Sequence, residues 1–318
     1  MNNTKKLTEA SILSSLFIVC TIAAVASGFG YTLYLDFIVP VFFCLICLKC
    51  EFKYTMLAGI SSLLIIGLVL GNIGTAIWAT QNVLLGIMIG VLLNKSTSIM
   101  DDLVFGSILG VLLMVLVDVY ASTLIGYSFM KEFQGYIKFI PNNQLANTIY
   151  YLLIATFPFG MVFSVYYISL IVGKKLKVVQ GNSKKKLEIM SRFRLYSRYL
   201  CCSKEVFYSC AIYILLVETI KMFNFTTDIV YLKTVIISVE YLCMYFVVKD
   251  GFLAIQNYVV GKYKNIFYAK VLSLFTLCVI IFLFKITIFI IVICNILLDI
   301  KINIRVIQND IINNLVNN

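Results

Sequence analysis

The strongest constraint in this 318-residue sequence is a succession of apolar runs, each close to 20 residues long. A helix needs about 20 apolar residues to cross the hydrocarbon core of a bilayer. Lipid offers the backbone no hydrogen bonds, so such runs cross the membrane as helices. Only 13% of the residues are charged and 61% are hydrophobic, whereas soluble domains carry about 25% charged residues. The sequence therefore predicts an all-α polytopic membrane protein and argues against a water-soluble enzyme, a disordered chain or a nucleic-acid-binding domain.

The apolar runs predict about ten transmembrane helices, with eight to ten as the range. Residues 249–264 are mixed in character and are expected to lie at the membrane interface. The last apolar run, 268–299, is too long for one span, so we expect two helices divided near Lys285. The other eight helices are expected at residues 7–27, 31–48, 54–70, 75–94, 103–127, 148–173, 206–223 and 229–248.

The positions of the basic residues predict the orientation. Ten of the 26 Lys and Arg residues lie within 174–204, where Glu188 is the one acidic residue. Cytoplasmic loops of membrane proteins are rich in Lys and Arg. If Lys5 and Lys6 are cytoplasmic, six helices bring residues 174–204 to the cytoplasm, and ten helices bring the C-terminus there. We therefore expect a multi-pass protein of the cell membrane with both termini in the cytoplasm. The net charge of +11 is then explained by basic cytoplasmic residues that face anionic lipid.

Composition changes along the chain at the basic loop. Residues 1–173 hold 14 of the 17 glycines, and the remainder of the chain is richer in Ile, Phe and Tyr. We expect residues 1–173 to form a Gly-rich six-helix lobe, 174–205 to form a basic cytoplasmic loop, 206–300 to form a lobe of about four helices, and 301–318 to form a cytoplasmic tail.

Three pairs of glycines in the first lobe are spaced as G-x-x-x-G. Small residues at this spacing let two helix backbones approach closely, which favours helix association in lipid. Three pairs in consecutive helices indicate a tightly packed bundle. These helix-packing candidates are Gly67 and Gly71, Gly86 and Gly90, and Gly106 and Gly110.

Polar residues inside apolar helices are candidates for function, because they are costly to bury in lipid. Trp78 and Asn82 share one helix face at i, i+4, and Gln81 is adjacent. A lone Trp beside amides near the outer membrane surface could stack on and hydrogen-bond a small planar ligand. Asp36, near the outer end of its helix, is a separate intramembrane polar candidate. The first expectation is that Trp78 is an interfacial anchor and that the amides bond to neighbouring helices, and the ligand site is the alternative. Asp118 is expected to face the bundle interior, where it serves either a ligand or another helix.

The second lobe contains a separate set of charged residues. Glu218 and Lys221 lie at i, i+3, and Asp228, Lys233 and Glu240 follow in the next helix. Because the two helices form a hairpin, ion pairs between them would offset the desolvation of each charge. A structural pairing role is the first expectation, and a proton or ion path through Glu240 is the alternative.

Residues suited to catalysis or metal binding are sparse. The chain contains no His, which removes His-dependent nucleophiles and His-ligated metals. Cys44, Cys47 and Cys50 form C-x-x-C-x-x-C, but thiols three and six residues apart on one helix drift around its axis and do not converge on a metal. We expect no enzymatic activity, no cofactor and no bound metal.

Short motifs at both ends of the chain resemble those of the YybS-like integral membrane proteins of Firmicutes. The N-terminal sequence from Thr4 to Phe17 resembles the start of these proteins. The segment 249–252, Lys-Asp-Gly-Phe, is similar to an Arg-Gly element of the family, and the stretch from Leu297 to Arg305 is similar to its closing Asp-to-Arg segment. This resemblance covers nearly the whole chain but implies no particular activity.

The first lobe also resembles the substrate-binding S components of energy-coupling-factor (ECF) transporters, which are six-helix bundles. Their first helix often carries an A-x-x-x-A pair that contacts a coupling subunit, and the matching residues here are Ala10 and Ser14. Their substrates bind near the outer face, where Trp78 and the loop 128–147 are expected in this chain. The four additional helices depart from the S-component pattern.

Three functions remain open from the sequence. The first is a transport-type protein that binds a small molecule in the N-terminal lobe, with a coupling subunit as its partner. The second is a membrane scaffold or regulator that recruits a cytoplasmic protein or lipid through the basic surface of Lys184, Lys185 and Lys186. The third is a membrane-embedded enzyme, for which the sequence offers few converging acids or amides.

Overall fold

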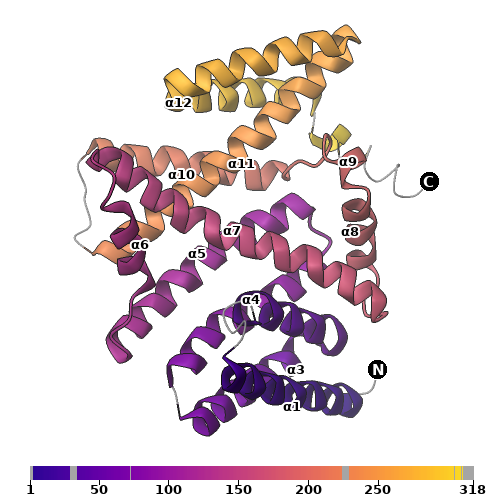
Figure 1. Ribbon diagram of the computed structural model, residues 1–318. Coiled ribbons are helices and arrows are strands. Elements are labelled where there is room, and N and C mark those ends of the chain that lie inside the picture. Colours follow the sequence, from indigo (N-terminus) through magenta and orange to yellow (C-terminus); the bar gives the residue numbers. More distant parts are fainter. Residues whose placement is uncertain are drawn as a thin grey trace. The chain divides into compact units, whose positions relative to one another are not determined.

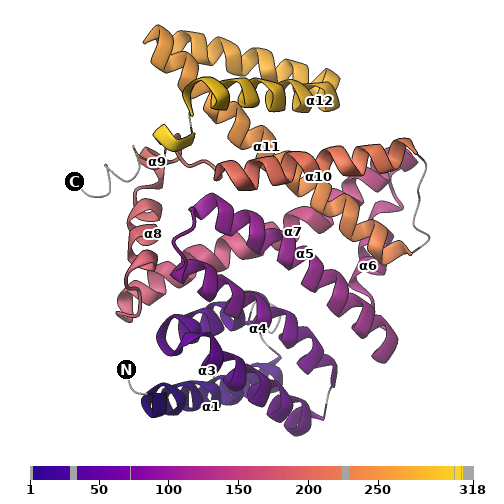
Figure 2. The ribbon, with the colours of Figure 1, turned by 180° about the vertical axis from the view of Figure 1, so that it is seen from behind.

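The computed structural model describes residues 3–28, 34–71, 73–223, 229–303, 305–308 and 310, which are the basis of everything that follows. Within these residues the chain is all-helical and contains no strand (Figures 1 and 2). In this described part of the chain, five helices are long and apolar enough to cross a membrane. These are α1 (Asn3–Ser27), α4 (Ile73–Asn94), α5 (Ile99–Leu124), α7 (Asn143–Lys175) and α11 (Val230–Tyr263).

The remaining elements differ in length and character. A short π-helical segment, η1, precedes the long helix α3, and α6 is a nine-residue helix between α5 and α7. Two short helices, α8 and α9, occupy part of the predicted basic loop. The bounds are η1 (Tyr34–Ile38), α3 (Val39–Leu70), α6 (Phe129–Ile137), α8 (Asn182–Ser191), α9 (Phe193–Tyr196), α10 (Lys204–Met222) and α12 (Ile266–Ile302).

Two helices contain internal breaks close to where the sequence predicts them. The backbone of α3 leaves the helical conformation at Glu51, between the two spans expected at 31–48 and 54–70. The backbone of α12 leaves it at Leu283, two residues from the predicted division at Lys285. In contrast, α11 does not end at residue 248 as the sequence predicts but continues through residues 249–263 to Tyr263. The predicted count of ten spans is not confirmed.

The chain forms two compact units that differ in membership from the two predicted lobes. Unit 1 comprises residues 1–97, 105–187 and 229–238, and unit 2 comprises residues 98–104, 188–228 and 239–318. Contacts explain why the short segment 98–104 belongs with unit 2. The Asp101 carboxylate accepts a hydrogen bond from the backbone N–H of Ser203 at 2.8 Å, and Met100 contacts the Lys249 ammonium.

In unit 1, α3 packs between α1 and α4, and the three helices lie side by side in both views (Figures 1 and 2). Glycines allow the close approach of α4 to α3. A Cβ at Gly86 would lie 2.2 Å from the carbonyl oxygen of Pro40, and one at Gly90 would lie 2.6 Å from the Cβ of Cys47. Neither position has room for a side chain. The glycines at this G-x-x-x-G spacing therefore allow α4 to pack closely against α3.

The other two glycine pairs differ from one another. Gly106 and Gly110 on α5 face Val162 and Pro158 of α7, at 2.8 and 3.0 Å from the added Cβ. Gly67 has ordinary space around it, and Gly71 ends α3 in the left-handed conformation with φ of 60°. Gly71 is therefore a helix C-cap rather than a packing residue.

Substitution of Gly86 by Ala should destabilise unit 1, because the new methyl group would overlap the Pro40 carbonyl and separate α4 from α3. Overpacking of this kind costs about 1–3 kcal/mol. The matched control is Gly67→Ala, where a Cβ would lie 3.5 Å from Ala76. Thermal unfolding in detergent should show a lower midpoint for Gly86→Ala and an unchanged or higher midpoint for Gly67→Ala. Equal midpoints would contradict the packing assigned to Gly86.

Candidate ligand-binding site

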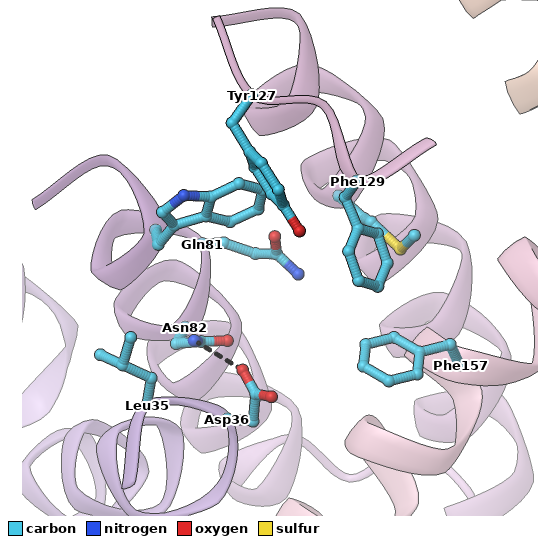
Figure 3. Close-up of a pocket in the computed structure, with 9 residues that line it drawn as sticks. Leu35, Asp36, Gln81, Asn82, Tyr127, Phe129 and Phe157 are labelled. Atoms are coloured by element: carbon cyan, nitrogen blue, oxygen red, sulfur yellow. Dashed lines mark hydrogen bonds between the residues drawn. The ribbon is translucent and has the colours of Figure 1, made fainter. Parts of the chain in front are cut away.

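A cavity of about 250 Å³ opens within unit 1 beside three of the predicted site residues (Figure 3). Its walls come from η1, α4, α5, α6, α7 and the turn that leads into α6. The cavity is mostly apolar, with polar groups gathered on one side. The lining residues are Leu35, Asp36, Trp78, Gln81, Asn82, Met114, Tyr127, Phe129 and Phe157.

The polar side of the cavity consists of a carboxylate and two amides. The Nδ2 group of Asn82 faces the Asp36 carboxylate at 3.5 Å, and the Gln81 amide extends toward the middle of the space (Figure 3). The Oδ1 atom of Asn82 is buried and has no hydrogen-bond partner among the described residues. A carboxylate accepts hydrogen bonds, so the amide nitrogen faces Asp36 and the amide oxygen is left as a free acceptor. Asp36 is the one charged residue among the nine that line the cavity.

Aromatic rings form the opposite walls. The Trp78 and Tyr127 rings meet edge to face, with centroids 5.9 Å apart. Phe129 and Phe157 face the carboxylate across the cavity, with their ring centroids 5.7 Å apart (Figure 3). Such rings offer their faces and edges to a flat or cationic group.

The Tyr127 hydroxyl is held by an acid outside the cavity. It donates a hydrogen bond to the Glu132 carboxylate, which raises the pKa of Tyr127 to about 12. Tyr136 donates to the other oxygen of the same carboxylate at 3.0 Å. Tyr127 therefore remains a neutral phenol at physiological pH, and its ring stays fixed against Trp78.

Asp118 does not line the cavity but anchors its wall. The carboxylate accepts hydrogen bonds from Ser128 Oγ at 2.8 Å and from the backbone N–H groups of Phe129 and Met130 at 2.6 and 3.3 Å. Phe129 and Met130 are the first two residues of α6, so the charge of Asp118 also meets the positive end of that helix. Asp118 is fully buried. Two roles were expected for Asp118, ligand binding or contact with another helix, and the geometry supports contact with another helix.

Small residues on α1 that were expected to contact a coupling subunit are already covered. Ala10 and Ser14 are 1% and 5% exposed. The Ser14 hydroxyl pairs with that of Ser62 at 2.6 Å and approaches the Ala58 carbonyl at 3.3 Å. α3 thus occupies the face of α1 that the S-component resemblance assigns to docking.

The three lysines of the predicted basic surface separate in the structure. Lys184 and Lys185 are exposed, whereas Lys186 is buried. The Lys186 ammonium donates to the Leu92 carbonyl at 2.7 Å, which is one of the last carbonyls of α4. A cation there stabilises the negative end of the helix. Lys186 is therefore part of the core rather than of a partner surface.

The charged residues of the second predicted set form ion pairs in unit 2. The Lys221 ammonium on α10 lies 2.5 Å from Glu240 on α11 and 3.3 Å from Glu218. Glu240 is 1% exposed, and its second oxygen has no hydrogen-bond partner among the described residues. Asp228 lies outside the described residues. These contacts join two neighbouring helices, α10 and α11.

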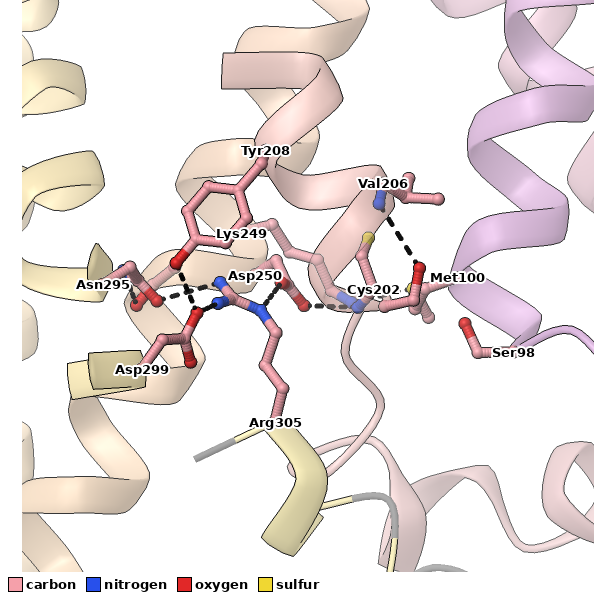
Figure 4. Close-up of polar contacts among 12 residues, drawn as sticks. Ser98, Met100, Cys202, Val206, Tyr208, Lys249, Asp250, Asn295, Asp299 and Arg305 are labelled. Atoms are coloured by element: carbon pink, nitrogen blue, oxygen red, sulfur yellow. Dashed lines mark hydrogen bonds and ion pairs between the residues drawn. The ribbon is translucent and has the colours of Figure 1, made fainter. Parts of the chain in front are cut away.

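Unit 2 contains a buried ionic network that the sequence interpretation did not assign to a site (Figure 4). The Arg305 guanidinium bonds to Asp299, to Asn295 Oδ1 at 3.0 Å and to Asp250 at 3.5 Å. It also stacks on the Phe207 ring at 3.9 Å. Segments 249–252 and 297–305, two of the three stretches with the YybS-like resemblance, therefore meet at Arg305. The sequence feature that could have indicated this network is the presence of isolated acids, Asp250 and Asp299, in largely apolar segments.

One comparison with known proteins, a family match, indicates membrane character. The profile of a family described as "Predicted membrane protein (DUF2232)" matches residues 12–151. No curated protein and no solved structure gives a significant match. The family match and the five apolar helices identify the chain as a membrane protein that contacts the lipid bilayer. The matched residues include the cavity residues on η1, α4 and α5, together with Tyr127 and Phe129.

Substitution of Asp118 by Asn should release the wall formed by Tyr127 and Phe129. The isosteric amide loses the charge that holds three donors, and charge-assisted hydrogen bonds contribute about 1.5–3 kcal/mol each. Trp78 is the one tryptophan in the chain, so its fluorescence reports on this wall. We expect a red-shifted emission and stronger quenching by acrylamide.

The matched control is Asn142→Ala, which removes the cap of α7. Asn142 accepts from the N–H groups of Gln144 and Leu145 at 2.9 and 3.3 Å, and it does not line the cavity. Both variants should unfold at lower temperature than the wild type, but Trp78 emission should change only in Asp118→Asn. An unchanged emission in a destabilised Asp118→Asn would show that Asp118 does not hold the wall.

Proposed function

We propose that this membrane protein binds a small planar molecule in the cavity beside Trp78 and that this binding serves transport across the membrane. The observation that carries the proposal is the unused acceptor Asn82 Oδ1 beside the Asp36 carboxylate. Buried polar atoms are normally hydrogen-bonded, and an exception needs an explanation such as a missing partner. A ligand with N–H donors would supply that partner.

The charge of the cavity defines the ligand further. Asp36 faces the cavity, and the other eight lining residues are uncharged. A carboxylate in apolar surroundings is stabilised by an opposite charge that binds beside it. The aromatic walls add favourable contacts with a flat cation. The ligand class is therefore a planar organic molecule with several N–H donors and a positive charge.

The wider architecture that we propose follows the sequence expectations. Unit 1 acts as an S-component-like binding lobe of a cell-membrane protein with about ten spans and cytoplasmic termini, and it uses no cofactor and catalyses no reaction. A coupling partner would dock elsewhere than at Ala10 and Ser14, because both residues are buried against α3.

A second candidate function is a membrane scaffold that recruits an acidic cytoplasmic partner. It is favoured by the exposure of Lys184 and Lys185 on α8, together with Lys174, Lys175 and Lys177 beside it. Exposed lysines in a cytoplasmic segment also bind anionic lipid, so this observation is less specific than the unused acceptor in the cavity. If the purified protein bound no ligand in the cavity, that result would favour the scaffold function.

The binding proposal is tested by titrating the purified protein with benzamidinium, a flat aromatic cation with several N–H donors. Because Trp78 is the one tryptophan, its emission should change saturably as the cavity fills. Asp36→Asn should weaken binding by about tenfold or more, since a hydrogen bond to a charged group contributes about 1.5–3 kcal/mol. Benzoate, which is flat but anionic, should leave the emission unchanged.

The control variant is Glu9→Gln, which removes an acid of α1 that pairs with Lys49 and does not line the cavity. Glu9→Gln should bind benzamidinium as the wild type does. If the wild type does not respond, or if Asp36→Asn and Glu9→Gln respond alike, the cavity does not bind a cation through Asp36.

A further inference from the structure

A second cavity, of about 390 Å³, lies beside the first within unit 1. It is an apolar groove between η1, α6 and α7. Five of its eight lining residues are large and apolar, and none is charged. The residues used below are Phe37, Phe133, Phe157, Gly160 and Ser164.

The groove and the polar cavity adjoin at a small group of aromatic rings. Phe157 lines both spaces. Phe129, which lines the polar cavity, contacts the ring of Phe133, which lines the groove, with centroids 4.3 Å apart. On the other side, Asp36 lines the cavity, and its neighbour Phe37 lines the groove. The two spaces therefore share walls on three elements.

The groove has room for an occupant. A Cβ added at Gly160 would meet no atom within 4 Å, and the Phe157 side chain is 39% exposed. α7, which carries both residues, is one of the helices able to cross a membrane. If α7 spans the bilayer, an apolar groove on it would face hydrocarbon rather than water.

We propose that the natural ligand is an amphiphile, with a cationic N–H-donating head in the polar cavity and an apolar tail that passes Phe157 into the groove. This inference rests on the proposed function and names its substrate class. The head satisfies Asn82 Oδ1 and Asp36, as a small planar cation would. The tail covers the apolar groove that adjoins that cavity at Phe157, and a ligand without a tail leaves the groove to ordinary lipid.

The test compares benzamidinium with 4-octylbenzamidinium, which carries the same head and an eight-carbon tail. Binding of each to the full-length protein in detergent is followed by Trp78 fluorescence. The tail should tighten binding to the wild type by about tenfold or more, because each methylene removed from solvent contributes favourably. Gly160→Phe fills the groove and should abolish that gain while leaving benzamidinium binding unchanged.

Two further variants serve as controls for the effect of Gly160→Phe. Gly261→Phe on α11 is the matched control, because a Cβ there also meets no atom within 4 Å and Gly261 lines neither cavity. It should keep the full gain from the tail. Ser164→Phe fills the groove from the next turn of α7 and should act like Gly160→Phe if the latter fails to fold. Measurement of every variant in the same detergent cancels the partition of the tail into micelles.

The outcomes separate the amphiphile inference from the proposed function. If benzamidinium binds through Asp36 but the tail gives equal gains in the wild type and in Gly160→Phe, the groove holds only ordinary lipid and the amphiphile inference is overturned. If neither compound changes Trp78 emission, the proposed function itself fails and the inference fails with it. A gain that is lost in Gly160→Phe and kept in Gly261→Phe supports both.

Discussion

The buried carboxylate of Asp118 is the interaction on which the cavity of unit 1 depends. It holds Ser128 and the backbone N–H groups of Phe129 and Met130 at the start of α6. Without it, the first turn of α6 would have unpaired donors inside an apolar bundle, which is costly. Because Tyr127 and Phe129 are adjacent to these donors, one charge fixes two aromatic walls. The cavity is therefore formed before any ligand arrives, which reduces the entropy lost on binding.

Two groups of buried polar residues illustrate opposite uses of charge. In unit 2, Arg305 is surrounded by Asp250, Asp299 and Asn295, so its charge is compensated within the protein. In unit 1, Asp36 has one long contact with Asn82, whose oxygen has no partner among the described residues. Compensated charges hold helices together, and an uncompensated pair of acceptors is suited to an external cation. Unpartnered buried atoms occur in both groups, Asp299 Oδ1 among them, so the difference between the groups is that Arg305 and its acids compensate one another while Asp36 faces no cation among the described residues that line its cavity.

Helical class and the face shared by Trp78 and Asn82 followed from the sequence, since both depend on local periodicity and spacing. The aromatic wall of Phe129 and Phe157 did not, because these residues lie on separate elements that only tertiary packing brings together. The same limit applies to Lys186, whose neighbours Lys184 and Lys185 are exposed while it bonds to α4. The pattern of charges in the sequence identifies a basic segment, but it does not predict which lysine side chain is buried. The continuation of α11 to Tyr263 was missed because its charges resembled those of an interfacial segment.

Hydrogen exchange of the backbone amides of residues 127–133 tests the central claim most directly. If Asp118 holds a preformed wall, the amides of Phe129 and Met130 should exchange about a hundredfold or more slowly than unprotected amides, without added ligand. These two amides lie in the first turn of α6, where an isolated helix leaves N–H groups free. Protection there therefore reports on Asp118 rather than on the helix itself. Exchange at the rate of an unprotected segment would contradict a wall held by Asp118 and, with it, a cavity formed in advance of its ligand.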